Sequence, residues 1–318
     1  MGRIESHVEK LVEYFAGQRP LRTGSLVMTV FGDAIAPRGG ALWLSSLIAL
    51  LHVFGLSERL IRTSVTRLAK DDWLLAEPIG RQSMYRLSAA GQHRLEEATK
   101  RIYQGPRPLW DGKWHLVLLG GVEARRRDQL RRRLSHLGFG SFSAEVMAHP
   151  TLDLQSVDRH FADSDEWASA LMMTGNIDQT PQHATLQAMV RRSWALDELN
   201  ARHAAFLGTF RPLYKMLKKT RQISPLHAYQ IRTLMIHEYR KTILRDPNLP
   251  EALLPPDWNG YAAYQLCRNI YARVAAQGEA YVSETAHTSD GPLPPPDSAF
   301  FRRFGAVIQT PPRSRSAK

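Results

Sequence analysis

The chain has 318 residues, 43% of them hydrophobic and 23% charged, which suits two or three compact domains and excludes a largely disordered or fibrous protein. Lysines and arginines outnumber acidic residues by 42 to 30, so the formal net charge of +12 favours DNA, RNA, anionic membrane surfaces or phosphorylated ligands as partners. The single cysteine, Cys267, excludes an intramolecular disulfide framework and any zinc site built on paired thiolates, which suits a reducing cytoplasm.

The two stretches that resemble targeting or membrane segments are both too polar. The N-terminal residues 1–14 carry Arg3, Glu9 and Glu13 among their apolar side chains, unlike the uninterrupted apolar core of a signal peptide. The most apolar stretch, 42–56, is too short and too interrupted by serine and histidine to span a bilayer, and it is typical of a buried helix. We therefore expect a cytoplasmic protein with no membrane partner.

The first predicted domain, residues 1–104, contains a helix-turn-helix pattern. An apolar helix is predicted over 41–54, Gly55 ends it, and Ser57 caps a second helix by accepting from the free amides of the first turn. The second helix places Ile61, Val65 and Leu68 on one face and basic or hydroxyl side chains on the other. One face is therefore expected to pack and the other to read DNA.

A β-hairpin follows this helix and completes a winged helix-turn-helix. Strands are predicted over 73–77 and 83–87, with a turn at 78–81 between them. Arginine side chains match guanine edges and phosphates, threonine offers a hydroxyl and a methyl group, and lysine holds phosphate. The predicted DNA-binding residues are Arg59, Arg62, Thr63, Thr66, Arg67 and Lys70 on the helix, Arg81 at the tip of the wing and Arg86 on the returning strand. The alternative is an ordinary amphipathic helix with solvated cations, but the combination of capped basic helix and basic hairpin is more specific than either alone.

A second domain is predicted over 109–186, after a joint rich in glycine and proline at 105–108. Its pattern alternates in the order βαββαβ, which is that of a small ferredoxin-like domain. The predicted elements are strand 114–119, helix 123–137, strands 139–142 and 145–147, helix 153–161 and strand 170–174.

The remainder of the chain is predicted to be a helical domain over 188–284 followed by a Pro-rich tail over 285–318, to which the sequence assigns no role. A proline-rich loop at 246–257 divides the helices. The fold class is therefore α+β and mainly helical.

Several segments together are typical of one known family: 25–40 (SLVMTVFGDAIAPRGG), 43–56, 57–73 (SERLIRTSVTRLAKDDW), 80–83, 85–87, 110–114 (WDGKW), 237–245 (HEYRKTILR) and 246–259 (DPNLPEALLPPDWN). With these segments the chain resembles the PaaX family, repressors of phenylacetic acid catabolism. The resemblance extends over nearly the whole chain up to about Glu284.

The resemblance implies an N-terminal winged helix, a Cas2-like middle domain and a helical C-terminal domain. It further implies a transcriptional repressor of an aromatic-acid operon that binds double-stranded operator DNA and is released by phenylacetyl-CoA. Such a protein is not an enzyme and needs no cofactor beyond its effector. Because one winged helix covers only a short half-site, we also expect a homodimer on an inverted repeat.

Two alternatives remain open. A Cas2-like metal-dependent nuclease would need carboxylates at the end of the first middle-domain strand, but Gly120 and Gly121 stand there and the nearby acids are scattered among cations. The histidine spacings do not place two metal ligands together, and Cys267 on an apolar helical face is expected to be a core residue.

A basic adaptor for RNA or protein would use the arginine run 125–133, which can equally be a solvated face or an auxiliary DNA-backbone contact.

An acyl-CoA effector needs cations for its phosphates and an apolar, aromatic-lined slot for its acyl group. We expect the effector site outside the winged helix, with the C-terminal helices as its location. The candidate ligand-binding residues are Arg192, Trp194, Phe206, Arg211, Lys215, Tyr229, Tyr239 and Arg240.

Overall fold

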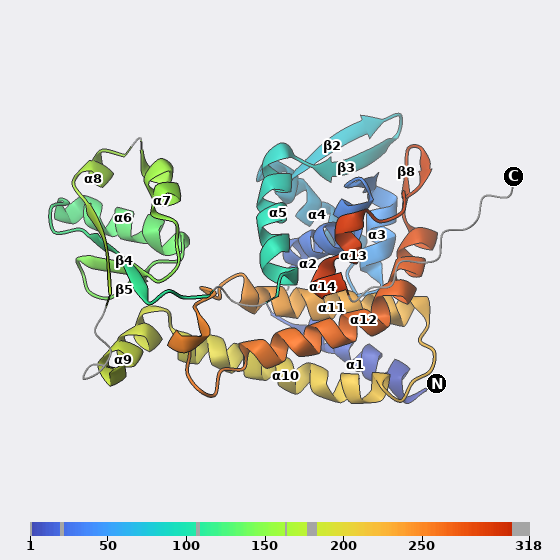
Figure 1. The fold of residues 1–318 in the computed structure, drawn as a ribbon. Coiled ribbons are helices and arrows are strands. Elements are labelled where there is room, and N and C mark those ends of the chain that lie inside the picture. The colour runs from blue at the N-terminus through green and yellow to red at the C-terminus, as the bar shows by residue number, and fades with distance from the viewer. Residues whose placement is uncertain (1, 20–21, 106–108, 163, 177–182, 307–318) are drawn as a thin grey trace, which may run out of the picture. The chain divides into compact units, whose positions relative to one another are not determined.

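The structure is a computed structural model that describes residues 2–19, 22–105, 109–162, 164–176 and 183–306. The chain divides into two compact units, each assembled from separate stretches of sequence. The first unit comprises residues 1–105, 205–244 and 261–318, and the second comprises 106–204 and 245–260. The helices near the C-terminus therefore belong to the same unit as the N-terminal region (Figure 1).

The first unit contains the predicted winged helix. Helix α3 (Leu44–His52) and helix α4 (Glu58–Lys70) form the helix-turn-helix, and strands β2 (Leu74–Ile79) and β3 (Gln82–Leu87) form the hairpin. Strand β1 (Ala41–Trp43) completes a sheet with the order β1-β3-β2. The sequence predicted helix from residue 41, but the chain is extended up to Trp43 because Ala41–Trp43 pairs with β3.

Helices surround this winged helix. Helix α1 (Arg3–Gly17), which was not predicted, buries Ile4, Val8 and Phe15, and helix α5 (Ala89–Tyr103) follows the wing. Helix α2 (Thr23–Val30) continues into a π-helical turn, Phe31–Ile35, and a 3-10 turn, Ala36–Arg38. A π-turn inside a helix widens the backbone and is frequent at functional positions.

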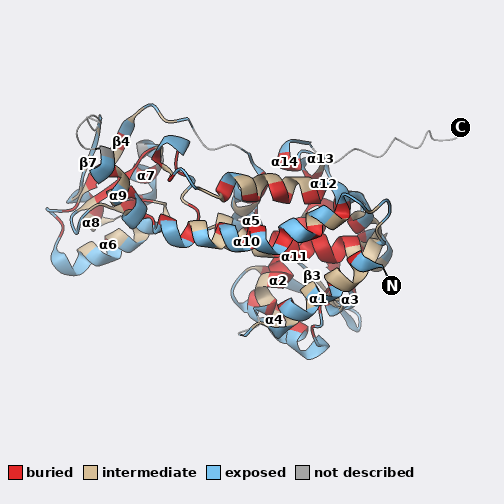
Figure 2. Cartoon of the chain, turned by 90° about the horizontal axis from the view of Figure 1, so that it is seen from below, coloured by how far each residue is buried: buried red, intermediate tan, exposed pale blue. Residues whose placement is uncertain are grey.

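Helices α10 (Leu196–Leu217), α11 (Pro225–Ile243) and α12 (Gly260–Thr285) supply the rest of this unit, α10 only from residue 205 onward. Helix α11 is buried along almost its whole length (Figure 2). One hydrophobic cluster joins these helices to Ile4 and Val8 of α1 and to Ile102 of α5. They therefore share a core with the N-terminal part of the chain.

The segment after Glu284 differs from the predicted tail. Strands β8 (His287–Thr288) and β9 (Gly291–Pro292) form a small hairpin, and helices α13 (Ser298–Phe301) and α14 (Arg303–Ala306) follow. Phe300, Arg303 and Phe304 are buried in the first unit. The prolines favour a tail without regular structure, but the burial of these three side chains anchors the segment to the core of the first unit.

The second unit contains the predicted βαββαβ order. Its strands are β4 (Lys113–Leu118), β5 (Gly140–Ser141), β6 (Val146–His149) and β7 (Leu171–Asn176), and its helices are α6 (Ala124–His136), α7 (Leu154–Phe161) and the short α8 (Asp165–Ala168). All pairs in the sheet are antiparallel, in the order β5-β6-β4-β7. This is the ferredoxin-like topology that the sequence predicted.

Hydrophobic side chains cover both faces of this sheet. Val117 of β4 belongs to a cluster with residues of α6 and α7. Trp114, three positions earlier on the same strand, belongs to a second cluster with Val190 and Trp194, which lie in and after helix α9 (His183–Ser193). The 3-10 turn Glu251–Leu253 adds Leu253 to that second cluster. Each face is thus buried, as the period-two alternation of a strand requires.

Two buried histidines make the fold sensitive to acid. Nδ1 of His149 accepts hydrogen bonds from the amides of Thr151 and Leu152, at 3.1 and 3.0 Å, so the ring is neutral. Burial, aided by the nearby His115, lowers the pKa of His149 from 6.5 to about 4. Burial also lowers the pKa of His237 on α11 well below its usual value, with Lys241 and Arg240 adding to the effect.

We expect the protein to lose stability as the pH falls from 7.5 to 5. Since the folded pKa of His149 is lowered, the unfolded chain takes up a proton first, and stability falls once the pH drops below about 6.5. Over this range His149 alone accounts for about 2 kcal/mol. Urea unfolding at the two pH values measures this, and His149→Gln, which keeps an acceptor without titrating, should reduce the difference. An unchanged difference in His149→Gln, with the exposed His136→Gln as control, would contradict the assignment.

Candidate nucleic-acid interface

Helix α4 has one buried face and one exposed face. Ser57 caps it, with its Oγ accepting from the amide of Leu60 at 3.4 Å, as the sequence predicted. Ile61, Val65 and Leu68 are buried, and the helix packs against α2 and β2. The predicted DNA-binding side chains are all exposed: Arg59, Arg62, Thr63, Thr66, Arg67, Lys70, Arg81 and Arg86. The structure therefore gathers six of them on the outward face of one helix.

The two threonines have their hydroxyl protons engaged. Thr63 donates to the carbonyl oxygen of Arg59 at 2.8 Å, and Thr66 donates to that of Arg62 at 3.0 Å. Each hydroxyl oxygen keeps lone pairs that can accept from the amino group of adenine or cytosine, while each methyl group can contact a thymine methyl. In this conformation both threonines are acceptors and apolar contacts.

The cations on this surface differ in their internal partners. Arg62 forms an ion pair with Glu58 at 2.7 Å, and Arg86 lies 3.8 Å from Glu77 across the hairpin. Within the described ranges, Arg59, Arg67, Lys70 and Arg81 form no ion pair. Exposed ion pairs contribute about 0 to 1 kcal/mol, so a phosphate or a guanine can replace Glu58 as the partner of Arg62 at little cost.

The turn of the wing places Arg81 at its tip. Gly80 has a φ of 61°, a left-handed conformation that glycine adopts without strain, and Arg81 follows it. Arg86 lies farther back on β3, opposite Leu75. The first unit also holds 29 of the 42 lysines and arginines but only 15 of the 30 acidic residues, so the positive excess of the chain lies in the unit that carries α4.

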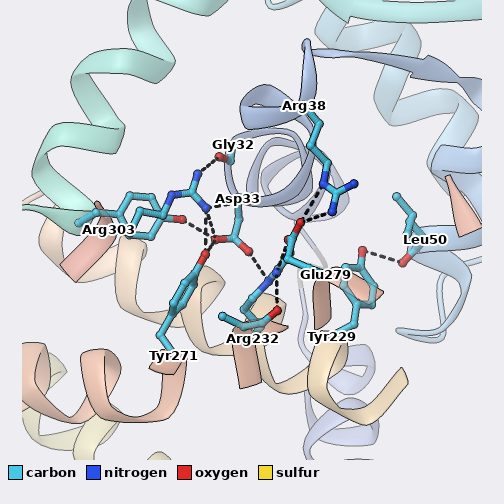
Figure 3. A network of polar contacts seen from close by, with 11 residues as sticks. Gly32, Asp33, Arg38, Leu50, Tyr229, Arg232, Tyr271, Glu279 and Arg303 are labelled. Carbon is cyan, nitrogen blue, oxygen red and sulfur yellow. Dashed lines mark hydrogen bonds and ion pairs between the residues drawn. The ribbon is translucent and has the colours of Figure 1, made fainter. Parts of the chain in front are cut away.

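A buried ionic network joins the π-turn to the C-terminal helices (Figure 3). Asp33 of the π-turn accepts hydrogen bonds at Oδ1 from the hydroxyls of Tyr103 and Tyr271, at 2.6 and 2.9 Å. Its Oδ2 lies 2.8 Å from Nε of Arg232 on α11, and Arg303 lies 3.2 Å from its Oδ1. Each charged partner of Asp33 therefore comes from a part of the chain at least 190 positions away.

Glu279 of α12 extends the network toward the winged helix. It forms ion pairs with both Arg232 and Arg38, and Arg38 also donates to the carbonyl oxygen of Pro294 at 3.2 Å. Burial by itself would lower the pKa of Arg232, but Asp33 and Glu279 outweigh it and raise that pKa above its ordinary value. The guanidinium is thus a permanent buried cation whose compensation depends on two carboxylates.

Helix α11 makes further contacts with the helix-turn-helix and with α2. The hydroxyl of Tyr229 donates to the carbonyl oxygen of Leu50 at 3.1 Å, and Gln230 donates to that of Val53 at 2.8 Å. His237 is hydrogen-bonded to Thr29, and Arg240 donates to the carbonyl oxygen of Ser25, both at 3.0 Å. Any displacement of α11 therefore acts on α2 and α3.

The candidate ligand-binding residues fall into separate groups. Arg192 and Trp194 lie in the second unit, where Trp194 donates to the carbonyl oxygen of Gly138. The other candidates, Phe206, Arg211, Lys215, Tyr229, Tyr239 and Arg240, lie in the first unit. Phe206 and Tyr239 pack together, with ring centroids 5.5 Å apart. Tyr229 belongs to the other core cluster of this unit, beside Phe54 and Tyr281.

The candidate ligand-binding residues also differ in how far they are buried. The four aromatic side chains are buried, Arg192, Arg211 and Lys215 are exposed, and Arg240 is half-buried against α2. The structure thus brings one aromatic pair together and leaves the remaining aromatic rings in separate parts of the core.

The described metal-ligating and nucleophilic side chains are either dispersed or buried. In the part of the chain that the structure describes, no three histidine, cysteine or acidic side chains gather closely enough to hold a metal ion. Cys267 is buried in the core, as predicted, and burial raises the pKa of its thiol well above the usual range. Among the described helices, none has the length and apolar composition needed to cross a bilayer.

The comparisons with known proteins agree on one family. Models described as PaaX-like protein, the PaaX protein central Cas2-like domain and the PaaX-like protein C-terminal domain match residues 22–91, 107–187 and 194–284. A relative from Escherichia coli (strain K12), the transcriptional repressor PaaX, is 38% identical over 303 residues, which cover 95% of this chain and 96% of the relative.

Among solved structures, the uncharacterized protein Rv0674 from Mycobacterium tuberculosis is 25% identical and gives a TM-score of 0.48, covering 74% of this chain and 90% of its own. Two findings decide the assignment: the three consecutive family matches, and the 38% identity to a repressor over 95% of this chain. The chain belongs to the PaaX family, a family of transcription regulators and not of enzymes.

Proposed function

We propose that the protein is a cytoplasmic transcriptional repressor of a phenylacetate or related aromatic-acid operon, released from its operator by an aryl-CoA such as phenylacetyl-CoA. The proposal that the protein binds DNA rests on the outward face of α4, where four cations and two threonines are exposed beside a basic wing. The relative from Escherichia coli named a transcriptional repressor supports the regulatory part. The effector is proposed from the family resemblance.

Within this interface we assign two roles. Arg62, Thr63, Thr66 and Arg67 read base edges in the major groove, since they are exposed in the middle of α4, between Arg59 near its start and Lys70 at its end. Arg59, Lys70 and Arg81 hold the phosphate backbone, and Arg86 assists them.

Release requires that the effector bind a DNA-incompetent arrangement more tightly than the competent one. Helix α11 is the element through which we propose this coupling, because it contacts α2 and α3 and carries Arg232. Its Tyr239 packs on Phe206 in the core, so an aryl group that enters between these rings must shift α11. Exposed Arg211 and Lys215 on α10 are the proposed contacts for the CoA phosphates.

The effector is tested by titrating the complex of full-length protein and operator. The operator is the duplex that the protein enriches from a random library, and fluorescence anisotropy follows its release. Phenylacetyl-CoA should release the duplex, whereas free phenylacetate and CoA alone should not. If none of the three compounds changes operator binding, the proposed effector is wrong, while the proposal of a repressor is not affected.

The selected duplex is expected to be an inverted repeat bound by a homodimer. Two winged helices related by a two-fold axis reach one face of the DNA when the half-sites lie about 10 base pairs apart, or a multiple of that. Light scattering of the complex and hydroxyl-radical footprinting measure stoichiometry and spacing. A monomer that protects a single half-site with full affinity would contradict this prediction.

A further inference from the structure

The arginines of the run on α6 differ in their contacts. Arg127 pairs with Glu145 at 2.7 Å, Arg131 donates to the hydroxyl of Ser141 at 2.9 Å, and Arg133 stacks 4.5 Å from the ring of Phe161. These three arginines hold α6 to its own unit. Arg125 and Arg132 are exposed and make no ion pair within the described ranges.

These two arginines lie on one stripe of the helix. Residues separated by four, seven and eleven positions share a helical face, which puts Arg125, Gln129, Arg132 and His136 in line. All four are exposed, and much of the α6 ribbon is coloured as exposed in Figure 2. Arg125 and Arg132 stand two turns apart, about 10 Å along the axis.

The acidic residues near α6 are engaged elsewhere. Asp128 lies 3.5 Å from Arg131, and Glu123 lies 3.9 Å from Arg126. Glu145 pairs with Arg127. Glu166 accepts a hydrogen bond from the hydroxyl of Ser164, which in turn accepts one from Arg133. The stripe therefore presents positive charge without a neutralising carboxylate from these neighbours.

We infer that the stripe Arg125, Gln129, Arg132 and His136 is a second DNA surface that contacts the phosphate backbone of the duplex flanking the operator. This inference rests on the proposed function, which brings a duplex to the chain. Arginine forks match phosphate oxygens, and a convex, exposed helix suits a backbone rather than an enclosed small ligand. The imidazole of His136 is the one aromatic ring of the stripe, which therefore lacks the series of aromatic side chains on which successive unpaired bases stack, and this disfavours single-stranded RNA.

The test compares two duplexes with the full-length protein. One is the selected operator alone, and the other carries in addition 15 base pairs of random sequence on each side. The test variant is Arg125→Gln with Arg132→Gln. The control, Lys113→Gln with Arg191→Gln, removes two exposed cations from the same unit.

The wild type and the control should bind the extended duplex more tightly than the operator alone. In the test variant this advantage should disappear, and the slope of log affinity against log salt on the extended duplex should become less steep by about 2. Binding of the operator alone should not change. An unchanged advantage in the test variant overturns the inference, and so does a loss confined to single-stranded RNA of the same length. A wild type that binds neither duplex overturns the proposed function as well.

Discussion

Replacing Arg232 by methionine should lower the free energy of unfolding by about 3 to 5 kcal/mol, the cost of leaving a buried charge without its partner. Arg232 is fully buried between Asp33 and Glu279, so its removal leaves two carboxylates in the core with a single arginine each, Arg303 and Arg38 respectively. Urea unfolding followed by circular dichroism at pH 7.5 measures the loss.

Two controls separate this effect from a general loss of packing. Arg202→Ala removes an exposed ion pair with Glu198 and should change stability by no more than about 1 kcal/mol. Adding Asp33→Asn to Arg232→Met removes one of the two carboxylates that lost Arg232 as a partner, so the double variant should be less destabilised than the sum of the single variants. Simple additivity would show that Asp33 and Arg232 do not act as a pair.

Replacing Arg62 and Arg67 together by alanine should weaken operator binding by roughly 30-fold to 25,000-fold, because each base-reading arginine contributes about 1 to 3 kcal/mol. Both side chains are exposed, so the stability of the variant should stay near that of the wild type. Anisotropy with the selected operator and with a scrambled duplex measures affinity and selectivity in one series.

The two roles assigned on α4 predict different patterns of loss. The Arg62 and Arg67 variant should lose its preference for the operator over the scrambled duplex, whereas Lys70→Ala should weaken both duplexes alike. Lys100→Ala with Arg221→Ala removes two exposed cations elsewhere in the same unit and serves as the matched control. If this control weakens operator binding as much as the α4 variant does, the assignment to α4 is wrong.

The parts of the fold that depend on local pattern could be predicted from the sequence. Ser57, the buried face of α4 and the hairpin after it follow from capping, periodicity and turn residues, all within 31 positions. The order of the ferredoxin-like unit follows from short runs of the same kind. Strand β1 was missed because only its pairing with β3, some 40 positions later, keeps an apolar segment extended.

The buried network could not be predicted because its members are far apart in sequence. Asp33 meets Arg232 and Arg303, and no local pattern relates those positions. One signal was present, since an acidic residue within the apolar run 26–36 must find a buried partner. The division of the arginine run had a partial signal: helical spacing puts Arg132 opposite the buried Leu130 and Leu134, whereas the bond from Arg131 to Ser141 depends on the packing of α6.

The central claim, that the exposed face of α4 reads a specific duplex, is tested most directly by selection from a random library of double-stranded DNA with the full-length protein. We predict enrichment of one inverted repeat by the wild type, and no enrichment by the variant with Arg62→Ala and Arg67→Ala. Enrichment of the same repeat by that variant, or a wild type that retains DNA without any sequence preference, would contradict the claim.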